Sequence, residues 1–98
     1  PVRQDWAKQV YHLFVIRVAQ RDKLKKYLYD NGVETGIHYP TALPKLEAYD
    51  YVNQKKEDIF SNRSDESLLS LPIGEHITFE QVYQIARLIE KFFESENV

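Results

Sequence analysis

Three segments of the chain have the hydrophobic pattern of β-strands. Residues 10–18 are rich in β-branched and aromatic side chains and contain neither Gly nor Pro. Residues 33–39 and 68–73 are shorter apolar stretches, bounded or interrupted by Pro40 and Pro72. The pattern therefore predicts a small, mostly antiparallel sheet of three strands, with residues 10–18 as its central strand.

The expected central strand is apolar on both faces. Side chains alternate along a strand, so one face carries His12, Phe14, Ile16 and Val18, and the other carries Tyr11, Leu13, Val15 and Arg17. A strand covered on one side only would alternate apolar with polar residues. This strand is expected to need cover on both faces, and a chain of 98 residues has little material to provide it.

Two longer segments have apolar residues at helical spacing. Residues 22–31 are expected to form a helix with Asp22 as its N-cap, ended by Gly32, which adopts the left-handed conformation easily. The last helix is expected to begin at a capping box of Thr78 and Gln81. Apolar residues recur at helical spacing along it: Val82, Ile85, Ala86, Ile89, Phe92 and Phe93.

The middle of the chain carries weaker signals. Pro44 is expected to begin one helical turn, and residues 59–67 are predicted to form a polar helix capped by Asp58. Trp6, the large apolar side chain of the lead-in, is expected to cover one edge of the core. The order of elements predicts an α+β fold in which helices pack on the small sheet.

Composition and charge narrow the class of protein. With 13 Lys plus Arg against 15 Asp plus Glu, the chain lacks the basic excess that nucleic-acid binding needs, and an RNA-binding sheet using Tyr11 or Phe14 is disfavoured. No apolar run approaches the roughly 20 residues that span a bilayer, so no membrane partner is expected. The absence of cysteine excludes disulfides and is compatible with the cytoplasmic location that we expect.

Candidate binding residues gather in the segment 32–40, which holds two of the three glycines together with His38, Tyr39 and Pro40. Pro40 is expected to hold Tyr39 extended, so that the imidazole and the phenol sit on a constrained segment able to present polar groups to a ligand. An ordinary strand end has the same pattern, and spacing alone favours that interpretation.

The residues offer no complete catalytic apparatus and no metal site. His12, His38 and His76 lack the short spacing of zinc ligands. There is no Gly-x-Ser-x-Gly turn, and no Gly-rich loop follows a strand. The basic cluster on the first helix, Arg21, Lys23, Lys25 and Lys26, is expected to be solvated and to bind no ligand.

Two runs carry a resemblance to a known family: Thr35-Gly36-Ile37-His38-Tyr39-Pro40 and Leu69-Ser70-Leu71-Pro72. Together with the first strand, Tyr11–Arg17, and the closing amphipathic helix, they cover nearly the whole chain. In this order they resemble the C-terminal domain of the DegT/DnrJ-type sugar aminotransferases.

The resemblance implies the small C-terminal domain of a fold-type I enzyme that depends on pyridoxal 5'-phosphate (PLP). Such enzymes are homodimers that transfer an amino group, usually from glutamate, to a keto sugar linked to a nucleotide, in amino-sugar and polysaccharide biosynthesis. Residues 1–98 would form that single domain. None of the eight lysines matches the motif of the Schiff-base lysine, which the large domain carries, so the chain alone is expected to be inactive and to bind no cofactor.

The resemblance also implies site residues. In such enzymes the His-Tyr-Pro turn lies near the mouth of the active site, so His38 and Tyr39 are expected to contact the sugar nucleotide, with His12 as a weaker candidate. A histidine on an apolar face is more often a core residue. The alternative function is a free-standing α+β module that binds a small molecule or serves regulation.

Overall fold

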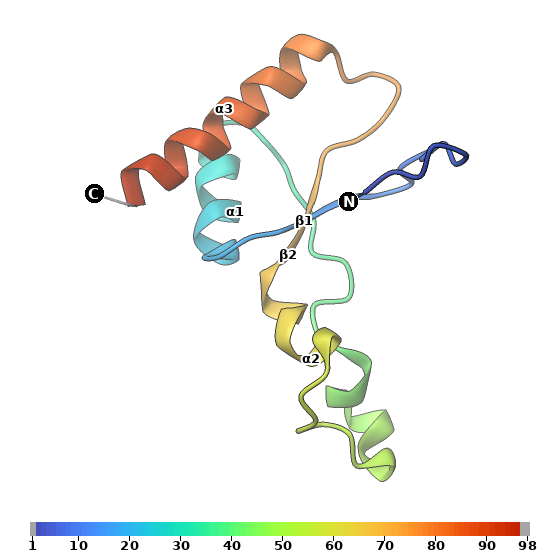
Figure 1. Ribbon diagram of the computed structural model, residues 1–98. Helices are drawn as coiled ribbons and strands as arrows, with labels where there is room; N and C mark the ends of the chain where they lie inside the picture. The colour runs from blue at the N-terminus through green and yellow to red at the C-terminus, as the bar shows by residue number, and fades with distance from the viewer. Residues whose placement is uncertain (1, 97–98) are drawn as a thin grey trace.

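In the computed structural model, which describes residues 2–96, two strands and three α-helices form a body with long projections (Figure 1). Their order is β1 (Phe14–Arg17), α1 (Arg21–Asp30), α2 (Phe60–Ser64), β2 (Leu68–Leu71) and α3 (Phe79–Glu96). The region between α1 and β2 also contains short 3-10 helices at Leu43–Lys45, Glu47–Val52 and Asp65–Ser67. The expected helices are confirmed, including the turn at Pro44.

The described residues form a two-stranded sheet, so the prediction of three strands was wrong. β1 and β2 pair antiparallel, with Phe14 opposite Leu71. The expected strand at residues 33–39 is reduced to a single bridge between Gly36 and Ser70. The chain turns soon after this bridge, because Tyr39 has a left-handed φ of 55°.

The central position belongs to β2, not to β1 as predicted. β2 pairs with β1 on one side, and its Ser70 bridges Gly36 on the other. β1 is also shorter than expected, because it begins only at Phe14, after a left-handed φ of 49° at Tyr11. The positive φ interrupts the extended backbone that a strand requires.

The core lies between one face of the sheet and the helices α1 and α3. Its buried members are Leu24 and Leu28 of α1, Leu69 of β2 and Phe92 of α3. Ile16 of β1 stands opposite Leu69 and packs against this cluster. Alternation along the strands places this group on one face and leaves Val15 and Ser70 on the other.

Backbone hydrogen bonds define the helix ends. Gly32 ends α1 at a φ of 83°, and the Val33 amide donates to the Leu28 carbonyl at 2.8 Å, as in a Schellman motif. At the start of α1 the N-cap is Gln20, without a side-chain cap, so the assignment of Asp22 was wrong. α2 likewise begins after Ile59, not after an Asp58 cap.

The capping box of α3 is confirmed by two hydrogen bonds. The Gln81 amide donates to Thr78 Oγ1 at 3.2 Å, and the Thr78 amide donates to Gln81 Oε1 at 3.0 Å. Such reciprocal bonds satisfy backbone donors that have no partner within the helix. The boundary between the loop and α3 was therefore readable from the sequence.

The face of the sheet opposite the core is only partly covered by the described residues. His38 lies against Ser70, and the Arg17 guanidinium lies 5.2 Å from the centre of the Phe60 ring, a cation–π contact. Val15, between them, remains 44% exposed. The expectation that this chain provides too little cover for both faces agrees with this arrangement.

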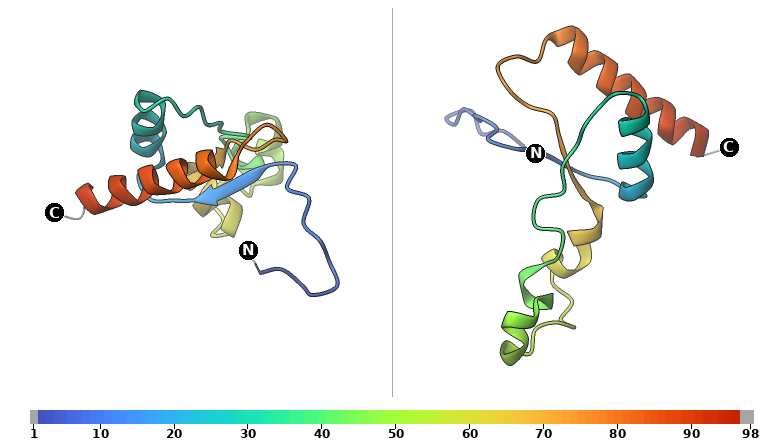
Figure 2. Two further views of the ribbon diagram at one scale, coloured as in Figure 1. Left: turned by 90° about the horizontal axis from the view of Figure 1, so that it is seen from above. Right: turned by 180° about the vertical axis from the view of Figure 1, so that it is seen from behind.

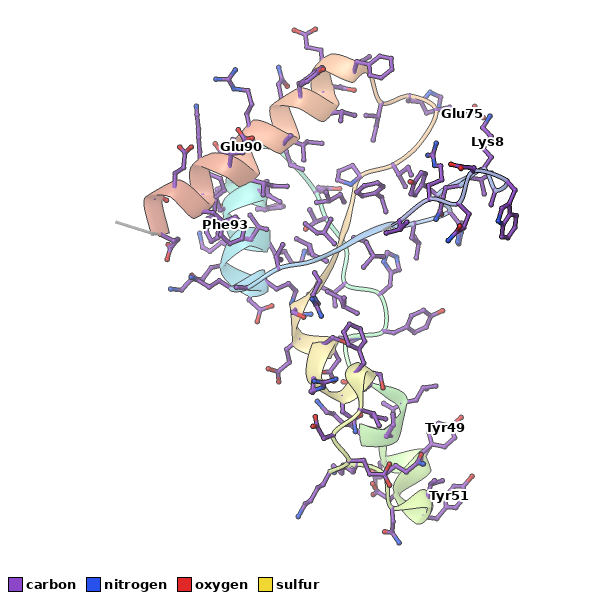
Figure 3. All side chains as sticks on the ribbon, in the orientation of Figure 1. Lys8, Tyr49, Tyr51, Glu75, Glu90 and Phe93 are labelled. Carbon is purple, nitrogen blue, oxygen red and sulfur yellow. The ribbon has the colours of Figure 1, made fainter. Side chains whose placement is uncertain are left out.

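Two limbs extend from the body, the N-terminal segment 2–13 and an arm formed by residues 41–67 (Figure 2). Trp6 in the N-terminal segment is 86% exposed, so the expectation that it covers the core was wrong. In the arm, Tyr49 and Tyr51 lie at the end farthest from α1 and α3 (Figure 3). The limbs give the molecule far more surface than a compact domain has.

The accessible surface measures this openness. It is 8221 Å², whereas a folded monomer of 11.6 kDa is expected to expose about 5,800 Å². The radius of gyration is 16.0 Å, against about 13 Å for a compact chain of this length. Within residues 2–96 no helix has both the length and the apolar character needed to cross a membrane.

Candidate functional site

The segment from Gly36 to Ala42 is held at both ends by hydrogen bonds. At its start the Gly36 amide donates to the Ser70 carbonyl at 2.9 Å, and the Ser70 amide donates to the Gly36 carbonyl at 2.8 Å. At its end the Ala42 amide donates to Oδ2 of Asp65 at 2.9 Å. His38 and Tyr39 therefore lie on a loop whose ends are fixed by the sheet and by the arm.

The His38 ring folds back toward the sheet. Its Nδ1 lies 2.8 Å from Oγ of Ser70, on the face away from α1 and α3. The glycine at position 36 leaves room for this ring, because a Cβ there would lie 3.0 Å from Cε1 of His38. The Gly-Ile-His spacing thus has a structural reason that spacing alone did not reveal.

Tyr39, the next residue, is 86% exposed. The prediction that Pro40 keeps it extended was wrong, since its φ is 55°. A left-handed non-glycine residue costs about 1–2 kcal/mol. The hydrogen bonds at both ends of the segment hold the turn and override the local preference of a residue before proline.

A groove of about 640 Å³ runs between the His-Tyr-Pro segment and α2. Its walls are mostly apolar, with the buried Asp65 at one side, and include Tyr39, Leu43, Leu46, Phe60 and Leu68. An apolar groove with one polar group is a common form of ligand site. The structure brings Tyr39 to this groove, while His38 next to it is held at the sheet.

Asp65 links the arm to the body. Besides the Ala42 amide it accepts a hydrogen bond from Lys45 Nζ at 3.0 Å. Burial raises the pKa of this carboxyl, but the bonds from Ala42 and Lys45 lower it by more, so its pKa lies below the ordinary 3.8. The carboxylate therefore stays charged in a buried position.

Arg21 contradicts the expectation that the basic cluster of α1 is solvated. Its guanidinium is buried and donates to the Asp65 carbonyl at 3.0 Å and to the Leu68 carbonyl at 3.2 Å. These carbonyls lie at the junction of the arm and β2, where the backbone leaves the 3-10 helix without a regular partner. Arg21 is therefore a structural link between α1 and the arm.

The structure does not bring His12 to the groove. His12 lies in an exposed bend before β1, and it lines a separate hollow formed with the N-terminal segment. Of the three predicted site residues, His38 and Tyr39 are neighbours on one held segment and His12 is apart.

Sequence reasoning missed Ser70, Asp65 and Arg21, which shape this region. The signal that was present for Ser70 is a polar residue between two apolar ones in the Leu-Ser-Leu-Pro run. A serine in a short apolar strand has to find a partner when buried. Asp65 and Arg21 lie in polar surroundings in the sequence, so no local pattern distinguished them.

The lysine beside the groove is engaged in an ion pair. Lys45 is the lysine next to the groove, and its ammonium donates to the Asp65 carboxylate, so it is not free to form a Schiff base. Within residues 2–96 no group of three or more His, Asp or Glu side chains is placed to hold a metal ion.

Comparison with known proteins places the chain among aminotransferases. The profile of the DegT/DnrJ/EryC1/StrS aminotransferase family matches residues 1–90. A relative in Saccharopolyspora erythraea, the erythromycin biosynthesis sensory transduction protein EryC1, is 38% identical over 81 residues, covering 82% of this chain and 22% of the relative.

Two further comparisons agree. The dTDP-3-amino-3,6-dideoxy-alpha-D-galactopyranose transaminase of Aneurinibacillus thermoaerophilus is 32% identical over 92 residues, covering 94% of this chain and 25% of the relative. The crystal structure of S. venezuelae DesV in complex with ketimine intermediate matches with a TM-score of 0.80 and 29% identity, over 94% of this chain and 25% of that one. The chain thus spans about a quarter of the length of its relatives.

Proposed function

We propose, since this chain belongs to the DegT/DnrJ/EryC1/StrS aminotransferase family, that it forms the small C-terminal domain of a PLP-dependent sugar aminotransferase. The enzyme would transfer an amino group from glutamate to a keto sugar linked to a nucleotide, in amino-sugar or polysaccharide biosynthesis. The observation that carries the proposal is the match to named sugar transaminases over 94% of the chain, which includes the held His-Tyr-Pro segment.

The exposed surface supports a role as one part of a larger enzyme. The excess over a compact monomer is about 2,400 Å², from a measured surface of 8221 Å². One partner in a standard interface loses only about 800 Å². We propose that a large domain covers the partly open sheet face and the limbs, and that residues 1–98 act as a single domain beside it.

The large domain would also hold the cofactor. PLP supplies the electron sink for moving an amino group. In this chain Lys45, the lysine next to the groove, is paired with the Asp65 carboxylate. This chain would contribute contacts to the substrate only. As the family resemblance implies, we propose a cytoplasmic homodimer.

His38 and Tyr39 are the residues that we propose to contact the sugar nucleotide. An imidazole and a phenol donate and accept hydrogen bonds, which suits the hydroxyl and phosphate oxygens of such a substrate. Both lie on a segment fixed at each end, so little ordering is needed on binding. His12 is a weaker proposed contact with the sugar nucleotide than His38 and Tyr39, because it lines a hollow separate from the groove.

Steady-state kinetics of the full-length enzyme test this assignment. With glutamate and a dTDP-linked keto sugar as substrates, His38→Ala is expected to lower kcat/KM for the sugar nucleotide about tenfold, the loss of one hydrogen bond to a charged or polar group. The value for glutamate should be nearly unchanged. His76→Ala, in the exposed loop before α3, is the matched control.

Equal losses for both substrates in His38→Ala would count against a contact with the sugar nucleotide. An enzyme that releases no 2-oxoglutarate with any dTDP-linked keto sugar, while it binds PLP, would count against the proposed function itself. The two results are separate, because the second is measured on the unaltered enzyme.

A regulatory or binding module is the second candidate, favoured by the name of the relative EryC1, a sensory transduction protein. Measurements on the 98-residue chain distinguish the two candidate functions. A part of a larger enzyme is expected to self-associate and to bind a hydrophobic dye strongly, because its apolar surface is open. A free-standing module should be monodisperse in sedimentation, bind little dye and saturate with its own ligand.

A further inference from the structure

We propose that Ser70 holds His38 in the tautomer that carries its proton on Nε2, so that an N–H donor faces an oxygen atom of the ligand. The oxygen would belong to a sugar hydroxyl or a phosphate. The ligand part of this inference rests on the proposed function, whereas the tautomer follows from the hydrogen bonds around Ser70.

The Ser70 hydroxyl has one hydrogen-bond partner among the described residues. Ser70 is 5% exposed, and its amide and carbonyl are both used by Gly36. Its Oγ lies 2.8 Å from Nδ1 of His38. A buried hydroxyl proton without an acceptor is costly. The lone pair on Nδ1 of His38 is the acceptor within hydrogen-bond distance, so the Ser70 hydroxyl donates to Nδ1.

The tautomer follows from the direction of this bond. A neutral imidazole carries its proton on one nitrogen, and an Nδ1 that accepts a hydrogen bond leaves the proton on Nε2. The Nδ1 edge of the ring faces the buried hydroxyl, while His38 as a whole is exposed. Nε2–H is therefore the donor available to a ligand.

Gly36 keeps the ring in this place. A Cβ at position 36 would come within 3.0 Å of Cε1 and 3.5 Å of Nδ1 of His38, on the edge that meets Ser70. A side chain there would require the ring to shift by a few tenths of an ångström from its present position against the hydroxyl. Ser70 and Gly36 are thus positioning residues for His38, and neither is placed to contact the ligand itself.

The direction of the donor limits the ligand chemistry. An Nε2–H group donates to acceptor oxygens and cannot accept a hydrogen bond from an ammonium group, so it suits the hydroxyl or phosphate oxygens of a sugar nucleotide. Because His38 is proposed to contact the sugar nucleotide and not glutamate, Ser70 is expected to affect the use of the sugar nucleotide alone.

Nitrogen NMR of the 98-residue chain labelled with ¹⁵N-histidine tests the tautomer directly. At a pH where the imidazoles are neutral, the ¹⁵N chemical shifts of His38 are expected to show an unprotonated Nδ1 and a protonated Nε2. They should not show the averaged shifts of a ring that exchanges between its two tautomers. Ser70→Ala and Gly36→Ala should both produce the averaged tautomers, Ser70→Thr should restore the fixed one, and His76 should be unchanged throughout.

A protonated Nδ1 in the unaltered chain would overturn the proposal, and so would an averaged ring. That spectrum needs no variant to fold. In the full-length enzyme, Ser70→Ala should raise KM for the sugar nucleotide about fivefold, with recovery in Ser70→Thr. A fixed tautomer without this kinetic effect would overturn the ligand contact. Absence of amino transfer in the unaltered enzyme would overturn the proposed function, while the spectrum still decides the role of Ser70.

Discussion

Leu28→Ala is expected to remove most of the stability of the isolated chain at 25 °C. Leu28 is 0% exposed and belongs to a core of four buried apolar side chains, shared by α1, β2 and α3. A leucine-to-alanine change in a packed core costs about 3–5 kcal/mol. A domain of this size is stable by about 5 kcal/mol at the lower end of the usual range, and the open surface places this chain near that end.

Urea denaturation followed by far-ultraviolet circular dichroism measures the effect. Leu43→Ala is the matched control, because Leu43 is 63% exposed in the arm and its truncation should cost less than about 0.5 kcal/mol. A Leu28→Ala chain that keeps a cooperative transition with a loss under about 1 kcal/mol would show that the core does not depend on α1 as described.

Asp65→Asn is expected to loosen the arm from the body. The change removes the charge that binds Lys45 and weakens the acceptor for the Ala42 amide, both at about 3 Å in the structure. Hydrogen bonds to a charged group are worth about 1.5–3 kcal/mol each. The Lys45 side chain is only half-buried, so its ammonium can bind water in place of the carboxylate and recover part of the lost free energy. We expect a loss of about 2 kcal/mol in the free energy of unfolding.

The same carboxylate gives the stability a dependence on pH. The pKa of Asp65 is lower in the folded chain than the ordinary 3.8, so the unfolded chain binds more protons as the pH falls. Its contribution is complete above about pH 5 and is lost as the pH falls through the folded pKa. Asp65→Asn should flatten this part of the stability curve.

Urea denaturation at a series of pH values below 6 provides the measurement. Glu66→Gln is the control, since it removes one negative charge from the neighbouring exposed position. If Glu66→Gln flattens the curve as much as Asp65→Asn, the pH dependence comes from general charge and not from the bonds to Ala42 and Lys45.

The elements set by nearby residues were predictable. The capping box of Thr78 and Gln81, the glycine that ends α1 and the helical turn at Pro44 all appear as expected. The errors concern the N-caps of α1 and α2, the strands and exposure. Residues 33–39 have the composition of a strand but keep one bridge, and Trp6 is apolar but lies in solvent. Strand pairing and burial depend on partners that the local pattern does not specify.

The candidate site was found only in part. His38 and Tyr39 stood out through the glycines and the proline around them, and their placement on one held segment agrees with that signal. The conformation of Tyr39 was not predictable from Pro40, because the bonds at Gly36 and Ala42 decide it. Ser70, the residue that orients His38, was visible only as a polar interruption of an apolar run.

Local signals in the sequence were enough to predict the helices, the C-terminal end of α1, the start of α3 and the family, since caps, periodicity and motifs depend on residues a few positions apart. Which polar groups meet was visible only in the folded chain. The bonds of Arg21 to Asp65, of His38 to Ser70 and of Ala42 to Asp65 join residues 44, 32 and 23 positions apart. Such contacts form only when the chain folds back on itself and buries both partners, so no local pattern records them.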